Sequence, residues 1–168
     1  MKKLLFTMFS AFGIISIAFA QSDSKIMASA GGGILAPACT NCSSLAGVEF
    51  AGGYAFTKHI VASLNLGLFS KAETGSKLKA FAVGISGDYY IKEAYKGFYV
   101  SPDLTLITLS NKYGGTTYSD NNFTVGLNLG WAIAIKDHFR IIPHFGYGTW
   151  FEDSKGRITA GLKIGYKI

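Results

Sequence analysis

The chain has 168 residues, of which 49% are hydrophobic, 14% aromatic and only 15% charged. Charged residues make up about a quarter of an average globular chain. This depletion, together with 21 Gly and only 3 Pro, excludes a disordered chain, a collagen and a coiled coil. The formal net charge of +6 is small and scattered along the chain, which argues against a nucleic-acid-binding surface.

Residues 1–20 have the features of a secretory signal peptide. A basic start precedes an apolar stretch that ends in the small-x-small sequence Ala18-Phe19-Ala20. An uncleaved membrane anchor is the alternative, but it needs about 20 apolar residues, and this stretch is shorter and interrupted by Thr and Ser. We therefore predict cleavage after Ala20, which leaves one exported domain over residues 21–168 in an oxidising compartment.

After the leader, apolar residues recur with a period of two, which is typical of strands with two different faces. In the last segment, Leu162, Ile164 and Tyr166 alternate with Lys163 and Lys167. Turn signals divide the chain into segments of this kind. Eight strands are predicted, over residues 26–35, 45–57, 60–70, 78–91, 97–109, 123–135, 139–151 and 157–168.

The connections between these strands alternate in character. Tight, charged turns are predicted at 58–59, 92–96 and 136–138. The intervening loops, mostly longer and rich in Gly, Ser, Thr and Asn, are predicted at 36–44, 71–77, 110–122 and 152–156. One end of the structure therefore carries tight turns and the other carries loops.

Residue volume decides which strand face meets which environment. A soluble sandwich or a lipocalin-type barrel would bury its apolar face. Here the polar face is made mostly of small residues, which suit a narrow lumen, whereas bulky residues such as Leu127, Leu129 and Trp131 lie on the other face. Strands of this length also match a tilted bilayer crossing. We predict that the apolar face meets lipid, where only a closed barrel satisfies the backbone.

Glycine-punctuated strands, such as residues 83–90 and 145–148, and the C-terminal Tyr166-Lys167-Ile168 resemble the small eight-stranded outer-membrane β-barrels of the OmpX and OmpA type. The resemblance covers residues 21–168. It implies an all-β fold, namely an eight-stranded antiparallel up-and-down transmembrane β-barrel. It also implies a location in the outer membrane of a Gram-negative bacterium, with both termini in the periplasm. It also implies that the barrel-assembly machinery reads Tyr166 and Ile168, although the family usually ends in Phe. Girdles of aromatic residues are expected near both ends of the barrel.

Strand alternation turns several charged side chains into the lumen. These are Glu49, Asp88, Asp103, Arg140, His144, Lys163 and Lys167. Isolated charges are costly in a narrow lumen, so we predict that the acids pair with the bases. The network could be a polar plug or a selectivity and gating device. Eight strands leave an interior just wide enough for side chains, which favours the plug.

Other motifs point to stabilising roles rather than to chemistry. Cys39 and Cys42 form a CxxC in a predicted loop, where a short-range disulfide is favoured over a redox or zinc site. The glycines of 31–33 lack the following helix of a phosphate loop, so close strand packing is expected. His144 and Ser101 could belong to a hydrolytic triad with Asp88 or Asp103, but no histidine falls in an outer loop, where lipid-modifying barrels hold their base.

The sequence therefore predicts a monomeric outer-membrane protein with a structural or surface-interaction role and no catalytic, metal or cofactor site. A passive pore for small solutes or ions is the alternative, and a lipid-modifying enzyme a weaker one. The expected partners are outer-membrane lipid, including lipopolysaccharide, and the assembly machinery. Basic residues of the loop side could contact lipopolysaccharide phosphates, although a solvated surface is favoured; they are Lys71, Lys77, Lys79, Lys112, Lys155 and Arg157, against Glu73, Asp120, Glu152 and Asp153.

Overall fold

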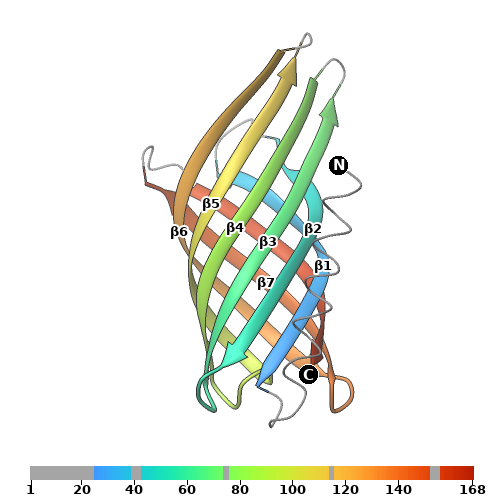
Figure 1. The fold of residues 1–168 in the computed structure, drawn as a ribbon, viewed down its shortest axis with the longest axis vertical. Coiled ribbons are helices and arrows are strands. Elements are labelled where there is room, and N and C mark those ends of the chain that lie inside the picture. The colour runs from blue at the N-terminus through green and yellow to red at the C-terminus, as the bar shows by residue number, and fades with distance from the viewer. Residues whose placement is uncertain (1–24, 39–42, 74–75, 114–115, 152–155) are drawn as a thin grey trace.

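The computed structural model describes residues 25–38, 43–73, 76–113, 116–151 and 156–168. Its strands are β1 (Ile26–Ala38), β2 (Leu45–Ala55), β3 (Ile60–Glu73), β4 (Ser76–Tyr90), β5 (Gly97–Tyr113), β6 (Thr116–Ala134), β7 (Phe139–Trp150) and β8 (Gly156–Lys167). They form a closed barrel in sequence order, with the strands steeply tilted (Figure 1). Within the described residues, no helix is long and apolar enough to cross a membrane.

Every strand pairs antiparallel with its neighbours, and β1 closes the barrel against β8, for example through Ala30 and Ile164. The predicted fold class is therefore confirmed. The predicted signal peptide (1–20) and the possible loop disulfide (Cys39 and Cys42) lie outside the described residues. We call the end with the connections at 56–59, 91–96 and 135–138 the turn end; β1 begins and β8 ends there. The opposite end is the loop end.

The strands extend beyond their predicted limits at the loop end. Residues 110–122 and 71–77 were expected as loops, yet β5 and β6 pair through Tyr113 and Thr116, and β3 and β4 through Glu73 and Ser76. Polar side chains bridge the extended β5–β6 pair: Thr108 Oγ1 donates to Asn121 Oδ1 (2.7 Å), and the hydroxyls of Ser110 and Ser119 lie 3.0 Å apart. This pair rises above its neighbours in Figure 1. A strand with water on both sides lacks the apolar alternation on which the sequence prediction relied.

The outward face is apolar between the turn end and the polar extensions at the loop end. Bulky residues whose side chains point outward, among them Phe123, Leu127, Leu129, Phe145 and Leu162, are between 39% and 64% exposed. Tyr54, Phe56, Tyr89, Phe139 and Tyr166 are exposed toward the turn end, and Phe81, Phe123 and Phe151 toward the loop end. The predicted assignment of the bulky face to the outside, with aromatic residues toward both ends, is confirmed.

The lumen contains more bulky apolar side chains than expected, since the inward face was predicted to consist mostly of small residues. Two apolar layers fill it near its ends. The turn-end layer consists of Met27, Ala55, Val61, Tyr90, Tyr95, Tyr99, Ala132 and Ile142. The loop-end layer consists of Leu35, Leu45, Phe69, Ala80 and Ile107, with Trp150 packed against it. Val61 and Ile107 are fully buried, so both layers are packed as tightly as a protein core.

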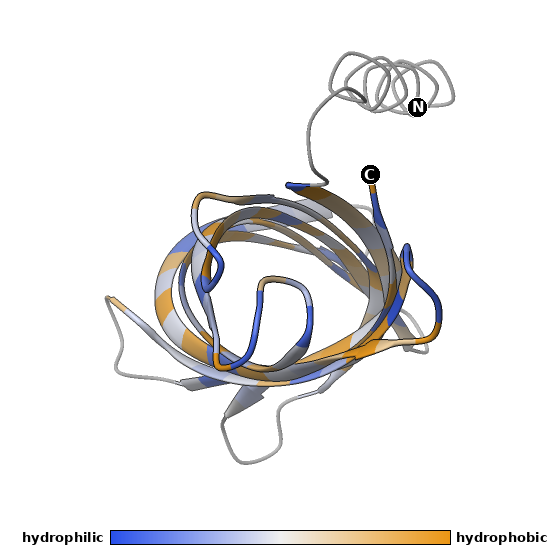
Figure 2. Cartoon of the chain, turned by 90° about the horizontal axis from the view of Figure 1, so that it is seen from below, coloured by the Kyte–Doolittle hydropathy of each residue, from blue (hydrophilic) through white to orange (hydrophobic). Residues whose placement is uncertain are grey.

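The turn at 91–96 forms part of the turn-end layer. Figure 2, seen from this end, shows a turn lying across the barrel opening. The Tyr95 hydroxyl donates to the carbonyl of Lys25 (2.9 Å), and the Ala94 N–H donates to that of Lys58 (2.7 Å), so this turn is tied to the residue before β1 and to the connection between β2 and β3. Burial raises the pKa of the Tyr95 phenol, which keeps its hydroxyl a donor. Tyr95 and Gly97 have positive φ, the conformation that folds the turn inward.

Candidate functional site

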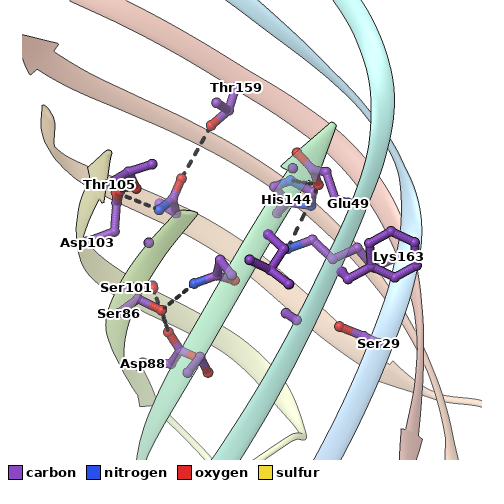
Figure 3. A pocket seen from close by; sticks show the side chains of 18 of the residues that line it. Ser29, Glu49, Ser86, Asp88, Ser101, Asp103, Thr105, His144, Thr159 and Lys163 are labelled. Carbon is purple, nitrogen blue, oxygen red and sulfur yellow. Dashed lines mark hydrogen bonds and ion pairs between the residues drawn. The ribbon is translucent and has the colours of Figure 1, made fainter. Parts of the chain in front are cut away.

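Between the two apolar layers lies a polar chamber with a cavity of about 110 Å³. Its charged lining residues come from β2, β4, β5, β7 and β8, and Figure 3 labels five of them: Glu49, Asp88, Asp103, His144 and Lys163. They are Glu49, Asp88, Asp103, His144, Arg157 and Lys163, accompanied by serine, threonine and asparagine side chains. Each sits at an inward position of its strand, because successive residues of a strand point to opposite faces.

Asp103 on β5 forms an ion pair with Arg157 inside the chamber. Arg157 Nη2 donates to Oδ2 of Asp103, and the side chains of Arg157 and Asp103 are only 8% and 5% exposed. Thr105 Oγ1 donates to the same oxygen (2.6 Å), and Asn128 Nδ2 donates to Oδ1 (2.8 Å). Arg157 had been predicted at the outer rim. β8 already begins at Gly156, so Arg157 is its second residue and points inward.

Asp88 on β4 is surrounded by hydroxyl groups. Ser101 (2.5 Å) and Ser86 (2.8 Å) donate to Oδ1, and Ser63 donates to Oδ2 (2.6 Å). No ion pair of Asp88 occurs within the described residues. Three hydroxyl donors stabilise a carboxylate without a cation, because each bond to a charged acceptor is stronger than a neutral hydrogen bond. The prediction that Asp88 pairs with a base is therefore wrong.

Glu49 on β2 faces His144 and Lys163. His144 Nε2 lies 2.9 Å and Lys163 Nζ 3.8 Å from Oε2 of Glu49. The alignment toward His144 is poor, so Oε2 receives no regular hydrogen bond, and His144 Nδ1 and Arg157 Nε also lack a partner in the described structure. Buried polar atoms of this kind are normally satisfied by ordered water. The cavity that these residues line has room for it.

Arg140 and Lys167 lie outside this chamber, at the turn end. Arg140 is buried, and its guanidinium donates to three carbonyl oxygens: Nε to Tyr95 (2.8 Å), and Nη1 to Lys136 (2.8 Å) and Phe139 (2.9 Å). The predicted pairing of Arg140 with an acid is therefore wrong. Arg140 is the second residue of β7, so its side chain holds the 91–96 turn in place at the barrel opening.

The geometry does not assemble a hydrolytic triad. Ser101 donates to Asp88, whereas His144 faces Glu49, so the hydroxyl and the imidazole engage different carboxylates. Within the described residues, no group of three or more His, Cys, Asp and Glu side chains could hold a metal ion. The arrangement is that of a closed network of buried charges.

Glycines at inward positions make room for the network. A Cβ at Gly146 would collide with Oδ1 of Asn128, and one at Gly130 with the ring of Tyr99. At Gly31, a Cβ would collide with the carbonyl oxygen of Leu162 on β8. The close strand packing predicted for residues 31–33 is thus confirmed at Gly31.

Sequence reasoning missed Arg157, the serines around Asp88 and the two apolar layers. The signal for all of them was present in the alternation. Leu35, Phe69 and Ile107 occupy inward positions, as does Arg157, the first residue of the strand predicted over 157–168.

Comparison with known proteins shows the fold. No protein-family model and no curated protein matches the sequence. Among solved structures, Neisserial surface protein A is similar with a TM-score of 0.72 and 14% identity, over 86% of this chain and 98% of that one. Ail, the attachment invasion locus protein of Yersinia pestis, follows with 0.64 and 13% identity, over 88% and 100%. The N-terminal domain of Pseudomonas aeruginosa OprF gives 0.63 and 13%, over 86% and 100%. The chain therefore has the fold of the small eight-stranded outer-membrane β-barrels.

Proposed function

We propose that this chain is a non-conducting outer-membrane barrel with a structural or surface-interaction role. The observation that carries this proposal is the filled lumen. The cavity of the chamber measures about 110 Å³, and clusters of buried apolar side chains lie toward both ends of it. A hydrated ion has no polar path through layers whose central residues, such as Val61 and Ile107, are fully buried.

The outward face supports a location in a membrane. Its bulky apolar side chains are exposed all around the barrel, and hydrocarbon is the environment in which such a surface is stable. By analogy with the fold, the turn end faces the periplasm together with both termini, and the loop end faces outward. The strand that ends in Tyr166 and Ile168 is the part that the barrel-assembly machinery would recognise.

The loop end is the surface that such a protein would present to its surroundings. The extended β5–β6 pair carries exposed polar residues over Thr116–Asn121, with hydrogen bonds between its side chains. Lys77, Lys79 and Lys112 are exposed near the same end, where their ammonium groups can contact phosphates of outer-leaflet lipopolysaccharide. All strand edges are paired within the closed barrel, which is consistent with a monomer.

Electrical recording in planar lipid bilayers tests the proposal. Purified barrel should insert without producing steady single-channel currents, because neither apolar layer admits water. A variant that thins both layers, Phe69→Ala with Tyr90→Ala, serves as the control that shows insertion, because it should allow current through the widened lumen.

Steady current through the unmodified protein would contradict the proposal. If replacing Asp88 with Lys then shifted its ion selectivity toward anions, the path would run through the chamber and the pore function would replace the structural one. Recovery of the protein in the soluble periplasmic fraction would contradict the membrane location itself.

A further inference from the structure

A second polar hollow lies at the turn end, separate from the chamber. It has a volume of about 370 Å³ and is enclosed by the 91–96 turn, the β6–β7 turn and the adjacent ends of β7 and β8. Six charged residues line it: Lys96, Lys136, Arg140 and Lys167, with Glu93 and Asp137. Neither the closed lumen nor the outward face requires charges to gather at this place.

Arg140 supplies a fixed donor to this hollow. Its Nε and Nη1 are held by the carbonyl oxygens of Tyr95, Lys136 and Phe139 at 2.8 to 2.9 Å, and the residue is only 6% exposed. Its Nη2 has no hydrogen-bond partner among the described residues, and it is not among the fully enclosed atoms. A guanidinium anchored in this way loses no further side-chain freedom when Nη2 binds an anion, which favours binding.

The remaining charges give the hollow a positive balance. Lys96 and Lys136 are exposed and Lys167 is half-buried, so their flexible ammonium groups can adjust to a ligand held by Arg140. Glu93 and Asp137 are exposed and form no ion pair within the described residues. Lys25, Lys58 and Lys92 add positive charge around the same end, so the local field attracts anions.

We propose that this hollow binds a phosphate group, with Arg140 as the fixed donor and Lys96, Lys136 and Lys167 as adjustable ones. Phosphate offers several acceptor oxygens in a tetrahedral arrangement, which suits donors that approach from different strands. The His138 and Tyr166 rings stack 5.6 Å apart at this edge, and Tyr166 also packs against Phe139. Aromatic residues of this kind mark the headgroup level of a bilayer. The phosphate can therefore come from a phospholipid headgroup or from a soluble ligand.

Calorimetric titration of the full-length mature protein in a phosphate-free maltoside detergent tests the site with inorganic phosphate. We expect saturable binding that weakens with added sodium chloride, because the attraction is electrostatic. Lys136→Ala should lower the affinity about fivefold, the effect typical of one lysine near a charged surface. Lys77→Ala at the loop end removes the same charge far from the hollow and should leave the affinity unchanged. Arg140→Lys should abolish the binding if the barrel still folds, but Lys136→Ala tests the site without disturbing the turn.

A second arm distinguishes the source of the phosphate. The protein is reconstituted in nanodiscs of phosphatidylglycerol or of an uncharged glycolipid, and phosphate is titrated again. Loss of phosphate binding in phosphatidylglycerol nanodiscs but not in glycolipid nanodiscs identifies the lipid headgroup as the occupant. Equal binding in both nanodiscs identifies a soluble ligand. Absence of saturable binding in detergent and in the uncharged nanodisc, or an equal loss for Lys77→Ala and Lys136→Ala, would overturn the proposal.

Discussion

Replacement of Arg157 by Met should destabilise the barrel more than any exposed charge replacement. Met keeps most of the volume of the Arg stem, so the loss reports mainly on the guanidinium. The Asp103 side chain is only 5% exposed and would keep its bonds from Thr105 and Asn128 but lose its cation. Removing one partner of a buried ion pair costs roughly 3 to 5 kcal/mol. The two remaining donors and the room for ordered water in the cavity place the expected loss near the lower limit, at about 3 kcal/mol.

Urea unfolding in detergent micelles measures this loss. The fluorescence of Trp131 and Trp150 reports the transition, and linear extrapolation gives the free energy of unfolding in water. Lys112→Met is the matched control: it removes an exposed cation at the loop end and should change the free energy by no more than about 0.5 kcal/mol.

A double-mutant cycle with Asp103→Asn separates the pair from its surroundings. The amide of Asn carries no charge, so the double variant should be less destabilised than the sum of the two single losses, by at least about 1 kcal/mol. If Arg157→Met were no more costly than Lys112→Met, or if the two losses simply added, the ion pair would not stabilise the lumen and the reasoning would be refuted.

Three further predictions concern the two faces of the barrel and the packing and hydrogen bonds of its lumen. Leu129→Arg places a charge in the bilayer and should make the free energy of folding into lipid vesicles less favourable by about 2 to 4 kcal/mol. Asn128→Arg, one residue away and pointing inward, should disturb the lumen and leave insertion unchanged. Equal effects of the two replacements on insertion would show that the faces are misassigned. Gly146→Ala should cost about 1 to 3 kcal/mol by overpacking against Asn128, and Gly87→Ala, where a Cβ meets nothing within 4 Å, should be neutral or slightly stabilising in the same urea titration. Asp88→Asn loses acceptor capacity for its three serine donors and should lower the unfolding free energy by about 1 to 3 kcal/mol; an unchanged midpoint would exclude a role for that cluster in stability.

The alternation of residues along the strands was sufficient to predict the fold and the faces. Leu127, Asn128 and Leu129 show why: successive side chains of a strand must point to opposite sides, and a shift by one residue would bring every bulky side chain into the lumen. Residue volume then distinguishes lipid from lumen. Neither the direction of a side chain nor the environment of a strand face depends on contacts between residues that are distant in the sequence.

Strand ends at the loop end could not be predicted in the same way. Residues 116–122 contain no apolar alternation, since both faces of that segment meet water. Their pairing depends on the register that β5 and β6 share nearer the barrel, and on cross-strand bonds such as the one between Thr108 and Asn121. Composition alone makes such a segment look like a loop rich in Thr, Ser and Asn.

The pairing of side chains inside the lumen could not be predicted from the sequence, for a different reason. Alternation gives the direction of a side chain but neither its height along the barrel axis nor its neighbour across the lumen. Asp103 and Arg157 are 54 residues apart. They meet because the strand register places them in one row with Gly126 and Gly148, which have no side chains to keep them apart. Arg140 has the same inward direction, yet it lies at the turn end and bonds to the backbone of the 91–96 turn instead.

The two apolar layers explain why charged groups can remain in the lumen at all. Leu35, Phe69 and Ile107 toward one end, and Val61 and Tyr90 toward the other, limit the contact of the chamber between them with bulk water. Fewer screening water molecules strengthen the attraction between Asp103 and Arg157, while the same exclusion raises the cost of leaving either group alone. A barrel that conducted ions would need the opposite arrangement, with charged groups hydrated along a continuous path. The apolar layers and the ion pair therefore depend on each other. Opening either layer should weaken the contribution of the Asp103–Arg157 pair to stability.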